Sequence, residues 1–246
     1  MNQRVHLVRA ISKLGLGSRS QAARWIGDGK VKVNGAPAES PEQWVELGRD
    51  AIEVDGLDRG GAGLSVAVPA RVYLALHKPA GYVTTRSDEL GRKTVYDLLP
   101  EELRAGWVFP VGRLDRESEG LLLMTDDGEW SNRLTDPESH VDKVYRVKLD
   151  GRPNPAELEA FRAGMTVSGR KTRPAEIAEE GADWYRVTLR EGRNRQIRRM
   201  FHALGYKVKR LIRVSIGSLA LGDMEPGEVR VLGPETAEAL GWRVEP

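Results

Sequence analysis

The amino-acid sequence predicts an α+β protein, in which a small N-terminal α+β module is tethered to a larger domain with a mainly antiparallel mixed sheet flanked by helices. Two observations lead to this prediction. Strand-like and helical segments alternate without the regular strand–helix–strand rhythm of a parallel sheet. A Gly-rich stretch without apolar periodicity separates two regions that have it. We therefore expect a module over 1–58, a linker over 59–70 and a larger domain over 71–246.

The N-terminal module should contain two short helices and a small sheet. Apolar residues at helical spacing predict the first helix: Leu7, Ala10, Ile11 and Leu14. The segment Ser18-Arg19-Ser20-Gln21 has the form of a capping box, and the helix that it opens should end near 27–29. The alternating segment 30–33 runs into Asn34-Gly35, a strong hairpin signal, and a further strand is expected at 51–54.

In the larger domain, β-type runs predict strands at 72–76, 144–149, 185–189 and 208–216. One helix is especially clear, because its apolar residues follow i, i+3, i+4, i+7 spacing: Ile197, Met200, Phe201 and Leu204. We expect Asn194 as its N-cap and Gly205 just beyond its C-terminal end. Its other face carries Arg195, Arg198, Arg199 and His202, which indicates either a solvated face or a binding face.

Positive charge is concentrated in two places, although the formal net charge is only +2. The first 32 residues contain seven basic residues, Arg4, Arg9, Lys13, Arg19, Arg24, Lys30 and Lys32, against the single acid Asp28. From 190 to 213 there are nine, Arg190, Arg193, Arg195, Arg198, Arg199, Lys207, Lys209, Arg210 and Arg213, against Glu191. A polyanion responds to local charge, so both regions are candidates for binding one.

Composition excludes several kinds of chemistry. The chain has no cysteine, which removes disulfides, thiolate metal sites and a Cys nucleophile, and fits a reducing compartment. Its four histidines lack the spacing of a metal site. The most apolar stretch, 64–76, is too short and too interrupted to span a membrane. We therefore expect a soluble cytoplasmic protein without a metal.

Asp115 is the most informative single residue. It lies in a polar turn between two apolar runs, 107–111 and 121–124. Such a carboxylate either hydrogen-bonds backbone amides of its turn or is reactive. Glu117 and Glu119 nearby would also permit a paired-carboxylate glycosidase site, although one turn does not specify the separation that this mechanism needs. The residues alone leave these alternatives open.

Four ordered segments together resemble the RsuA/RluB/RluE/RluF family of ribosomal RNA pseudouridine synthases. They are Leu76-His77-Lys78-Pro79-Ala80-Gly81-Tyr82, then Gly112-Arg113-Leu114-Asp115 with 118–122, then Lys143-Val144-Tyr145-Arg146-Val147, then 191–201. The first module resembles a small RNA-binding domain shared with a small-subunit ribosomal protein, through Gly17-Ser18-Arg19 and 29–35. The resemblance covers nearly the whole chain apart from the linker and the last twenty or so residues.

The resemblance implies that the protein isomerises a specific uridine of ribosomal RNA to pseudouridine without cofactor or metal. Asp115 would be the essential carboxylate, acting as nucleophile at the ribose or as base beside it. Arg198 would pair with Asp115 and keep it ionised, and Arg113 would support the site. Tyr145 would stack on the target base, although its alternation with Val147 and Leu149 on a strand also fits a core tyrosine.

The resemblance also implies an RNA partner, either ribosomal RNA or a ribosome assembly intermediate, engaged by a monomer. Basic side chains are the candidates for phosphate contacts: Arg19, Arg24, Lys30 and Lys32 in the module, and Arg193, Arg195 and Arg199 in the larger domain. The segment Arg193-Asn194-Arg195-Gln196-Ile197-Arg198-Arg199 is slightly closer to enzymes of this family that modify the large subunit. The alternative is a non-catalytic RNA-binding or ribosome-assembly protein with the same fold.

Overall fold

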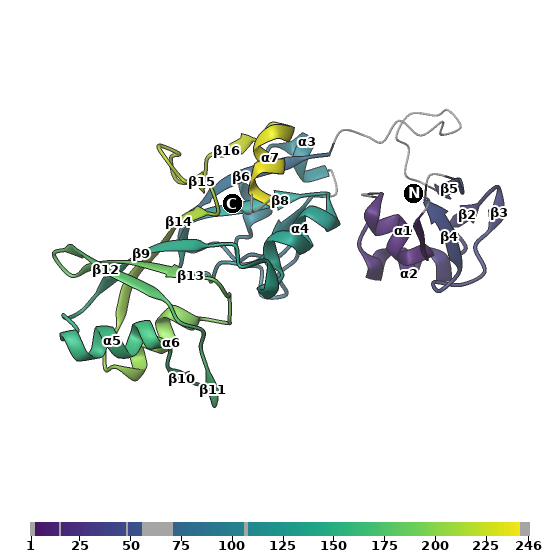
Figure 1. Ribbon diagram of the computed structural model, residues 1–246. Helices are drawn as coiled ribbons and strands as arrows, with labels where there is room; N and C mark the ends of the chain where they lie inside the picture. The colour runs from purple at the N-terminus through teal and green to yellow at the C-terminus, as the bar shows by residue number, and fades with distance from the viewer. Residues whose placement is uncertain (1–2, 15, 48, 56–70, 106–107, 242–246) are drawn as a thin grey trace.

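The computed structural model describes residues 3–14, 16–47, 49–55, 71–105 and 108–241 (Figure 1). The expected linker over 59–70 and the end of the module lie outside the described residues. The elements on the two sides of this gap build separate cores, one in the N-terminal module and the others on a large sheet.

The N-terminal elements match the predicted module. They are β1 (Gln3–His6), α1 (Leu7–Lys13), α2 (Arg19–Gly27), β2 (Val31–Val33), β3 (Ala36–Pro37), β4 (Trp44–Leu47) and β5 (Ile52–Val54). The capping box is present, because Gln21 N donates to Ser18 Oγ (3.0 Å) and Ser18 N donates to the Gln21 side chain (3.2 Å). Asn34 and Gly35 both have positive φ, 53° and 80°, as the predicted two-residue hairpin turn requires. The strands form two antiparallel sheets, β3-β2-β5 and β1-β4.

The larger domain is built on a nine-stranded sheet of order β12-β13-β9-β14-β8-β6-β16, with β15 paired to β14 and β7 to β8. Its strands are β6 (Tyr73–Lys78), β7 (Phe109–Val111), β8 (Glu119–Thr125), β9 (Lys143–Leu149), β12 (Glu176–Gly181), β13 (Trp184–Leu189), β14 (Val208–Ile216), β15 (Leu219–Ala220) and β16 (Val229–Val231), with a small hairpin of β10 (Thr166–Val167) and β11 (Arg170–Lys171). The pair β14–β8 is parallel and the other paired strands of this sheet are antiparallel. The predicted mainly antiparallel mixed sheet is confirmed.

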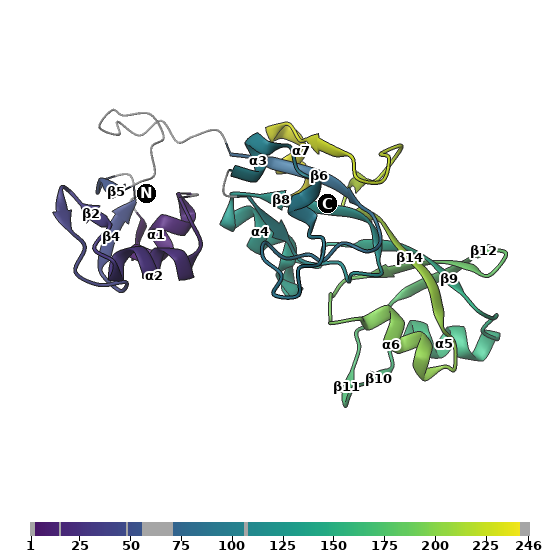
Figure 2. The same cartoon turned by 180° about the vertical axis from the view of Figure 1, so that it is seen from behind.

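Helices flank this sheet as predicted (Figure 2). They are η1 (Val95–Leu98), α3 (Glu101–Ala105), α4 (Gly128–Thr135), η2 (Pro137–Ser139), α5 (Pro155–Ala163), α6 (Gln196–Ala203) and α7 (Pro234–Gly241). On β8, Leu122 and Met124 join the core shared with α5 and α6, whereas Leu121 and Leu123 join the core shared with α4 and α7. Both faces of β8 are therefore buried, which explains its unbroken apolar run.

The start of α6 differs from the prediction. The helix begins at Gln196, and Arg195 is its N-cap residue in the left-handed conformation (φ 53°), without a side-chain cap. Asn194 does not cap the helix; its Oδ1 accepts a hydrogen bond from Arg199 Nη2 at 2.8 Å. Gln196 instead closes the turn, accepting from Arg193 N at 3.1 Å, and sequence spacing could not distinguish these two polar residues. The apolar face and the positive φ of Gly205 (88°) are confirmed.

Candidate active site

Asp115 lies in the loop between β7 and β8, where its backbone is fixed and its carboxylate is left available. Ser118 N donates to the Asp115 carbonyl at 3.0 Å. The Thr84 hydroxyl donates to the Leu114 carbonyl (2.8 Å) and accepts from Leu114 N (3.3 Å). Within the described residues the Asp115 carboxylate accepts no hydrogen bond, and it is 23% exposed. This geometry does not support the capping role expected of an ordinary turn aspartate.

Lys78 holds the same loop through hydrogen bonds to its backbone. Its side chain is completely buried at the end of β6. Its ammonium group donates to the carbonyls of Ser118 (2.7 Å), Pro79 (3.0 Å) and Arg116 (3.4 Å). Burial lowers the pKa of Lys78 to about 8, while the Asp115 carboxylate opposes this shift. Through the carbonyls of Arg116 and Ser118, this buried ammonium group holds the loop backbone that directly follows Asp115.

Asp115 and Tyr145 face the same pocket, whose volume of about 440 Å³ lies in the range of small-molecule sites. Tyr145, on β9, is 8% exposed and its neighbours are core residues, so one side chain belongs to the core and also lines the pocket. Arg113, Arg193 and Arg195 also line this pocket.

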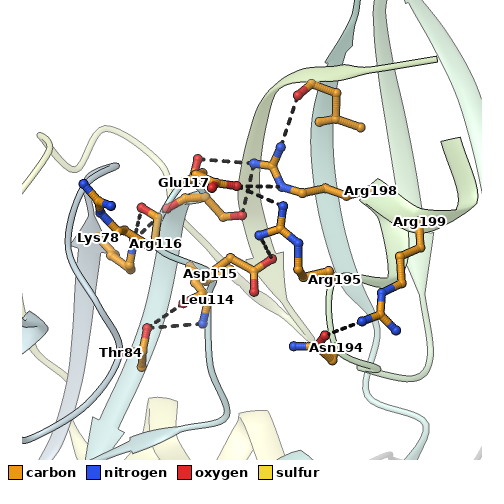
Figure 3. A network of polar contacts seen from close by, with 12 residues as sticks. Lys78, Thr84, Leu114, Asp115, Arg116, Glu117, Asn194, Arg195, Arg198 and Arg199 are labelled. Carbon is orange, nitrogen blue, oxygen red and sulfur yellow. Dashed lines mark hydrogen bonds and ion pairs between the residues drawn. The ribbon is translucent and has the colours of Figure 1, made fainter. Parts of the chain in front are cut away.

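Among the described residues, no ion pair within 4.0 Å joins Arg198 to Asp115, although the resemblance had suggested one. The cation nearest to the Asp115 carboxylate is Arg195, with Nη1 at 3.9 Å from Oδ2 (Figure 3). Arg195 Nη2 also donates to Glu117 at 3.0 Å. The left-handed backbone of Arg195 at the N-terminal end of α6 accounts for this arrangement, because it directs the side chain toward the carboxylates.

Arg198 instead connects α6 to the Asp115 loop and to β14. Its guanidinium group donates to the carbonyls of Val208 (3.1 Å) and Glu117 (3.3 Å), and its side chain is 13% exposed. Burial lowers the pKa of Arg198, while the Glu117 and Asp115 carboxylates raise it. Of the two alternatives left open for the basic face of α6, a solvated face does not describe Arg198, although Arg199 and His202 are exposed.

The other predicted RNA-binding residues fall into two groups. Around the pocket, Arg193 Nε donates to Glu191 at 2.9 Å, and Arg199 donates to Asn194 and Ser168 in a neighbouring cleft. In the N-terminal module, the candidate side chains lie on α2 and along β2: Arg19, Arg24 and Lys30, which are exposed, and Lys32, which is half-buried.

Two cationic residues of the pocket, Lys143 and Arg213, were not predicted as site residues from the sequence. Lys143 lies two positions before Tyr145 on β9, and Arg213 lies on β14, and both line the pocket. Their signal was present, because strand alternation places Lys143 on the same face as Tyr145. Arg213 could not be placed without the pairing of β14 with β9.

The described part of the chain shows neither a metal-binding cluster nor a membrane-spanning helix. There, no group of three or more His, Cys, Asp or Glu residues is arranged to hold a metal ion. None of the helices in those ranges is long and apolar enough to cross a membrane.

The family of the chain follows from comparison with known proteins. Residues 72–203 match the model of the RNA pseudouridylate synthase family, and residues 7–50 match the S4 domain. The chain belongs to the RNA pseudouridylate synthase family and carries an S4 domain at its N-terminal end. The resemblance seen in the sequence motifs is thereby confirmed.

Individual relatives are similar over most of the chain. Ribosomal large subunit pseudouridine synthase B of Bacillus subtilis is 36% identical, with 95% of this chain and 94% of the relative covered. The protein of the same name from Pseudomonas aeruginosa is 38% identical, over 97% of this chain and 62% of its own length. A crystal structure of a pseudouridylate synthase matches with a TM-score of 0.69 and 32% identity, over 96% of this chain and 99% of that one.

The glycosidase alternative loses its basis in the site. The two carboxylates that suggested it, Glu117 and Glu119, are engaged by Arg195 (3.0 Å) and Arg210 (2.7 Å), and neither lines the pocket of Asp115.

Proposed function

We propose that this protein converts a specific uridine of large-subunit ribosomal RNA to pseudouridine, using Asp115 as the essential carboxylate and no cofactor. The observation that supports this most is the shared pocket of Asp115 and Tyr145, surrounded by arginines. Relatives named as large subunit pseudouridine synthases support the choice of RNA. The substrate is either ribosomal RNA or an assembly intermediate, and the reaction takes place in the cytoplasm, where bacterial ribosomes are assembled.

In this proposal, the target uridine leaves its helix or loop and its base stacks on Tyr145 in the pocket. The Asp115 carboxylate then acts on the ribose, as nucleophile at C1′ or as base beside it. Arg195 supplies an opposite charge at 3.9 Å. Arg198 acts as a positioning residue, because it holds the carbonyl of Glu117 two residues after Asp115. Arg113, which is exposed on the pocket wall, supports the substrate.

RNA reaches this pocket across positively charged surfaces. Arg193, Arg195 and Arg199 contact phosphates near the pocket, and Arg19, Arg24, Lys30 and Lys32 contact them from the first module. We propose that residues 1–58 and 71–246 fold as two domains of a monomer, and that 59–70 tether them. The tether raises the effective concentration of the catalytic domain beside an RNA segment bound by the module.

The test is nucleotide-resolution mapping of pseudouridine in ribosomal RNA from cells that lack the gene, complemented by wild type, Asp115→Asn or Asp183→Asn. Asp183 is a matched control, since it pairs with Arg152 outside the pocket lining. We expect one large-subunit position to lose its modification without the gene and to regain it with wild type and Asp183→Asn only. Full modification with Asp115→Asn would refute catalysis by Asp115. An unchanged map without the gene would refute the enzyme activity and favour a binding role.

A further inference from the structure

Three side chains of the pocket share one face of the central sheet. Arg213 is the direct antiparallel partner of Tyr145, and Lys143 precedes Tyr145 by two residues on the same strand. Cross-strand partners and residues two apart point to the same side of a sheet. Lys143 and Arg213 therefore flank Tyr145, on the face where Asp115 lines the same pocket.

Arg213 is unusual for an arginine because it is only 3% exposed. On its other side, β14 approaches β8 so closely that a Cβ atom at Gly120 would collide with the Arg213 backbone. Its Nε donates to the Leu121 carbonyl at 2.7 Å. Its Nη2 is shielded from solvent and has no hydrogen-bond partner in the described ranges. An unpartnered donor of a buried charged group is costly, and its retention beside a pocket indicates a ligand.

Lys143 is a second cation of the pocket, and it forms no ion pair with a carboxylate within the described residues. Its ammonium group donates to the Val141 carbonyl at 3.2 Å. The adjacent Asp142 is engaged by Arg190 at 2.8 Å instead. Among the residues that the structure describes, neither Lys143 nor Arg213 has a carboxylate within 4.0 Å. The floor of the pocket therefore holds two cations that no side chain neutralises.

We propose that Arg213 and Lys143 bind the carbonyl edge of the target uracil and stabilise the negative charge that develops on this base when it separates from the ribose. The inference deepens the proposed function and rests on it. When the C1′–N1 bond breaks, its electron pair stays with the uracil, and the charge spreads onto the carbonyl oxygens. After rotation, C5 bonds to C1′. If Asp115 acted as nucleophile, its ester bond to C1′ breaks in this step; if it acted as base, it returns to the ribose the proton that it removed. The C5 proton then leaves and N1 is protonated, so the isomerisation needs neither oxidant nor reductant.

A base edge fits these two residues better than a phosphate does. A base stacked on Tyr145 would bring its edge over the flanking positions of the same sheet face, where Arg213 and Lys143 lie. A phosphodiester belongs to the RNA backbone, for which the exposed Arg193 and Arg195 offer contacts at the pocket rim. Donors placed in a dry site where charge develops contribute more to the transition state than to ground-state binding.

The test compares single-turnover rate constants on two transcripts of the target ribosomal RNA segment, one made with uridine and one with 5-fluorouridine. Digestion and mass spectrometry follow the formation of pseudouridine in the uridine RNA and the consumption of the target N-glycoside in the 5-fluorouridine RNA. The second readout differs because C5 of 5-fluorouracil has no proton to release, so its C5-linked product cannot complete the isomerisation. Fluorine makes uracil a better leaving group, so the reaction needs less stabilisation from the protein. We expect Arg213→Gln to lower the rate constant on uridine RNA by roughly 100-fold and on 5-fluorouridine RNA by roughly 10-fold. Lys143→Gln should show the same trend with smaller factors.

Arg230→Gln is the matched control, because Arg230 lies on β16 and pairs with Glu228 and Asp223 outside the pocket lining. Thermal melting checks that each variant folds. If Arg213→Gln does not fold, Lys143→Gln still decides the test, because Lys143 is only half-buried. Equal losses on both transcripts would assign a structural role and overturn the proposal, as would rate constants within about threefold of wild type. A loss confined to RNA affinity and its salt dependence would indicate a role in phosphate binding instead and also overturn it. If wild type converts neither transcript, the proposed function itself fails.

Discussion

The two positively charged regions of this protein are alike in sequence and different in structure. Around α6, the arginines have partners: Arg193 with Glu191, Arg195 with Glu117, Arg198 with backbone carbonyls and Arg199 with Asn194. In the N-terminal module, Arg19, Arg24 and Lys32 form no side-chain hydrogen bond or ion pair within the described residues, and Lys30 approaches Asp28 only to 4.0 Å. The arginines around α6 are held in place before RNA arrives, whereas Arg19, Arg24 and Lys32 of the module remain free to meet phosphates.

This difference predicts that a change near α6 should impair chemistry and that a change in the module should impair binding. We expect Arg198→Ala to lower turnover about 100-fold, since the Asp115 loop loses its link to α6, with a misplaced carboxylate as the consequence. Unfolding free energy should fall by about 1–3 kcal/mol, because the Val208 and Glu117 carbonyls lose a charged donor.

The control for this variant is Arg186→Ala, which removes an exposed arginine of β13 that pairs with Glu180. Steady-state turnover and thermal melts of both variants show whether Arg198 contributes to chemistry, to stability or to both. Wild-type turnover of Arg198→Ala would remove Arg198 from the active site.

The pH dependence of turnover should distinguish a contribution of the Lys143 charge from that of the arginines, which stay charged. Burial together with Arg213 lowers the pKa of Lys143 to about 8, so Lys143 is charged below this value and neutral above it. If its charge promotes the reaction, turnover should fall roughly tenfold as the pH rises from 7 to 9. Lys143→Arg should stay charged and lose this decline. Lys78 has a similar pKa but is present in both proteins, so a decline that persists in Lys143→Arg would be assigned to Lys78 and would contradict the role of Lys143.

The sequence predicted most of the fold because its signals are local. Apolar periodicity, the Ser18–Gln21 capping box and the Asn34-Gly35 turn depend on neighbouring residues, and each is present in the structure. Asp115 and Tyr145 were also predicted as site residues, through the resemblance of their motifs to the family, and the structure brings both into one pocket. The partner of Asp115 was missed because it depends on the left-handed backbone of Arg195. Arg213 was missed because its place in the pocket depends on the long-range pairing of β14 with β9 and β8.

The basic residues of the module provide the opposite test. Replacing Arg19, Arg24, Lys30 and Lys32 together by glutamine should weaken RNA binding about tenfold or more at physiological salt. The slope of log Kd against log salt should fall by roughly 0.7–0.9 for each phosphate that the module no longer neutralises. The single-turnover rate constant at saturating RNA should stay within about twofold of wild type. Filter binding over a salt series measures this slope, and the same measurement on Arg230→Gln is the control. An unchanged slope would contradict the idea that the basic residues of the module bind phosphates.

The smallest effect should be that of the whole module on the stability of the larger domain. The two parts have separate apolar cores. Lys13 of α1 forms an ion pair with Glu129 of α4 at 2.6 Å, but Glu129 is 60% exposed, and exposed pairs contribute about 1 kcal/mol or less. Deleting residues 1–70 should therefore shift the melting temperature of the remaining domain by no more than about 2–4 °C. A collapse of the melting transition in calorimetry would instead mean that the module is part of the catalytic domain's folding unit.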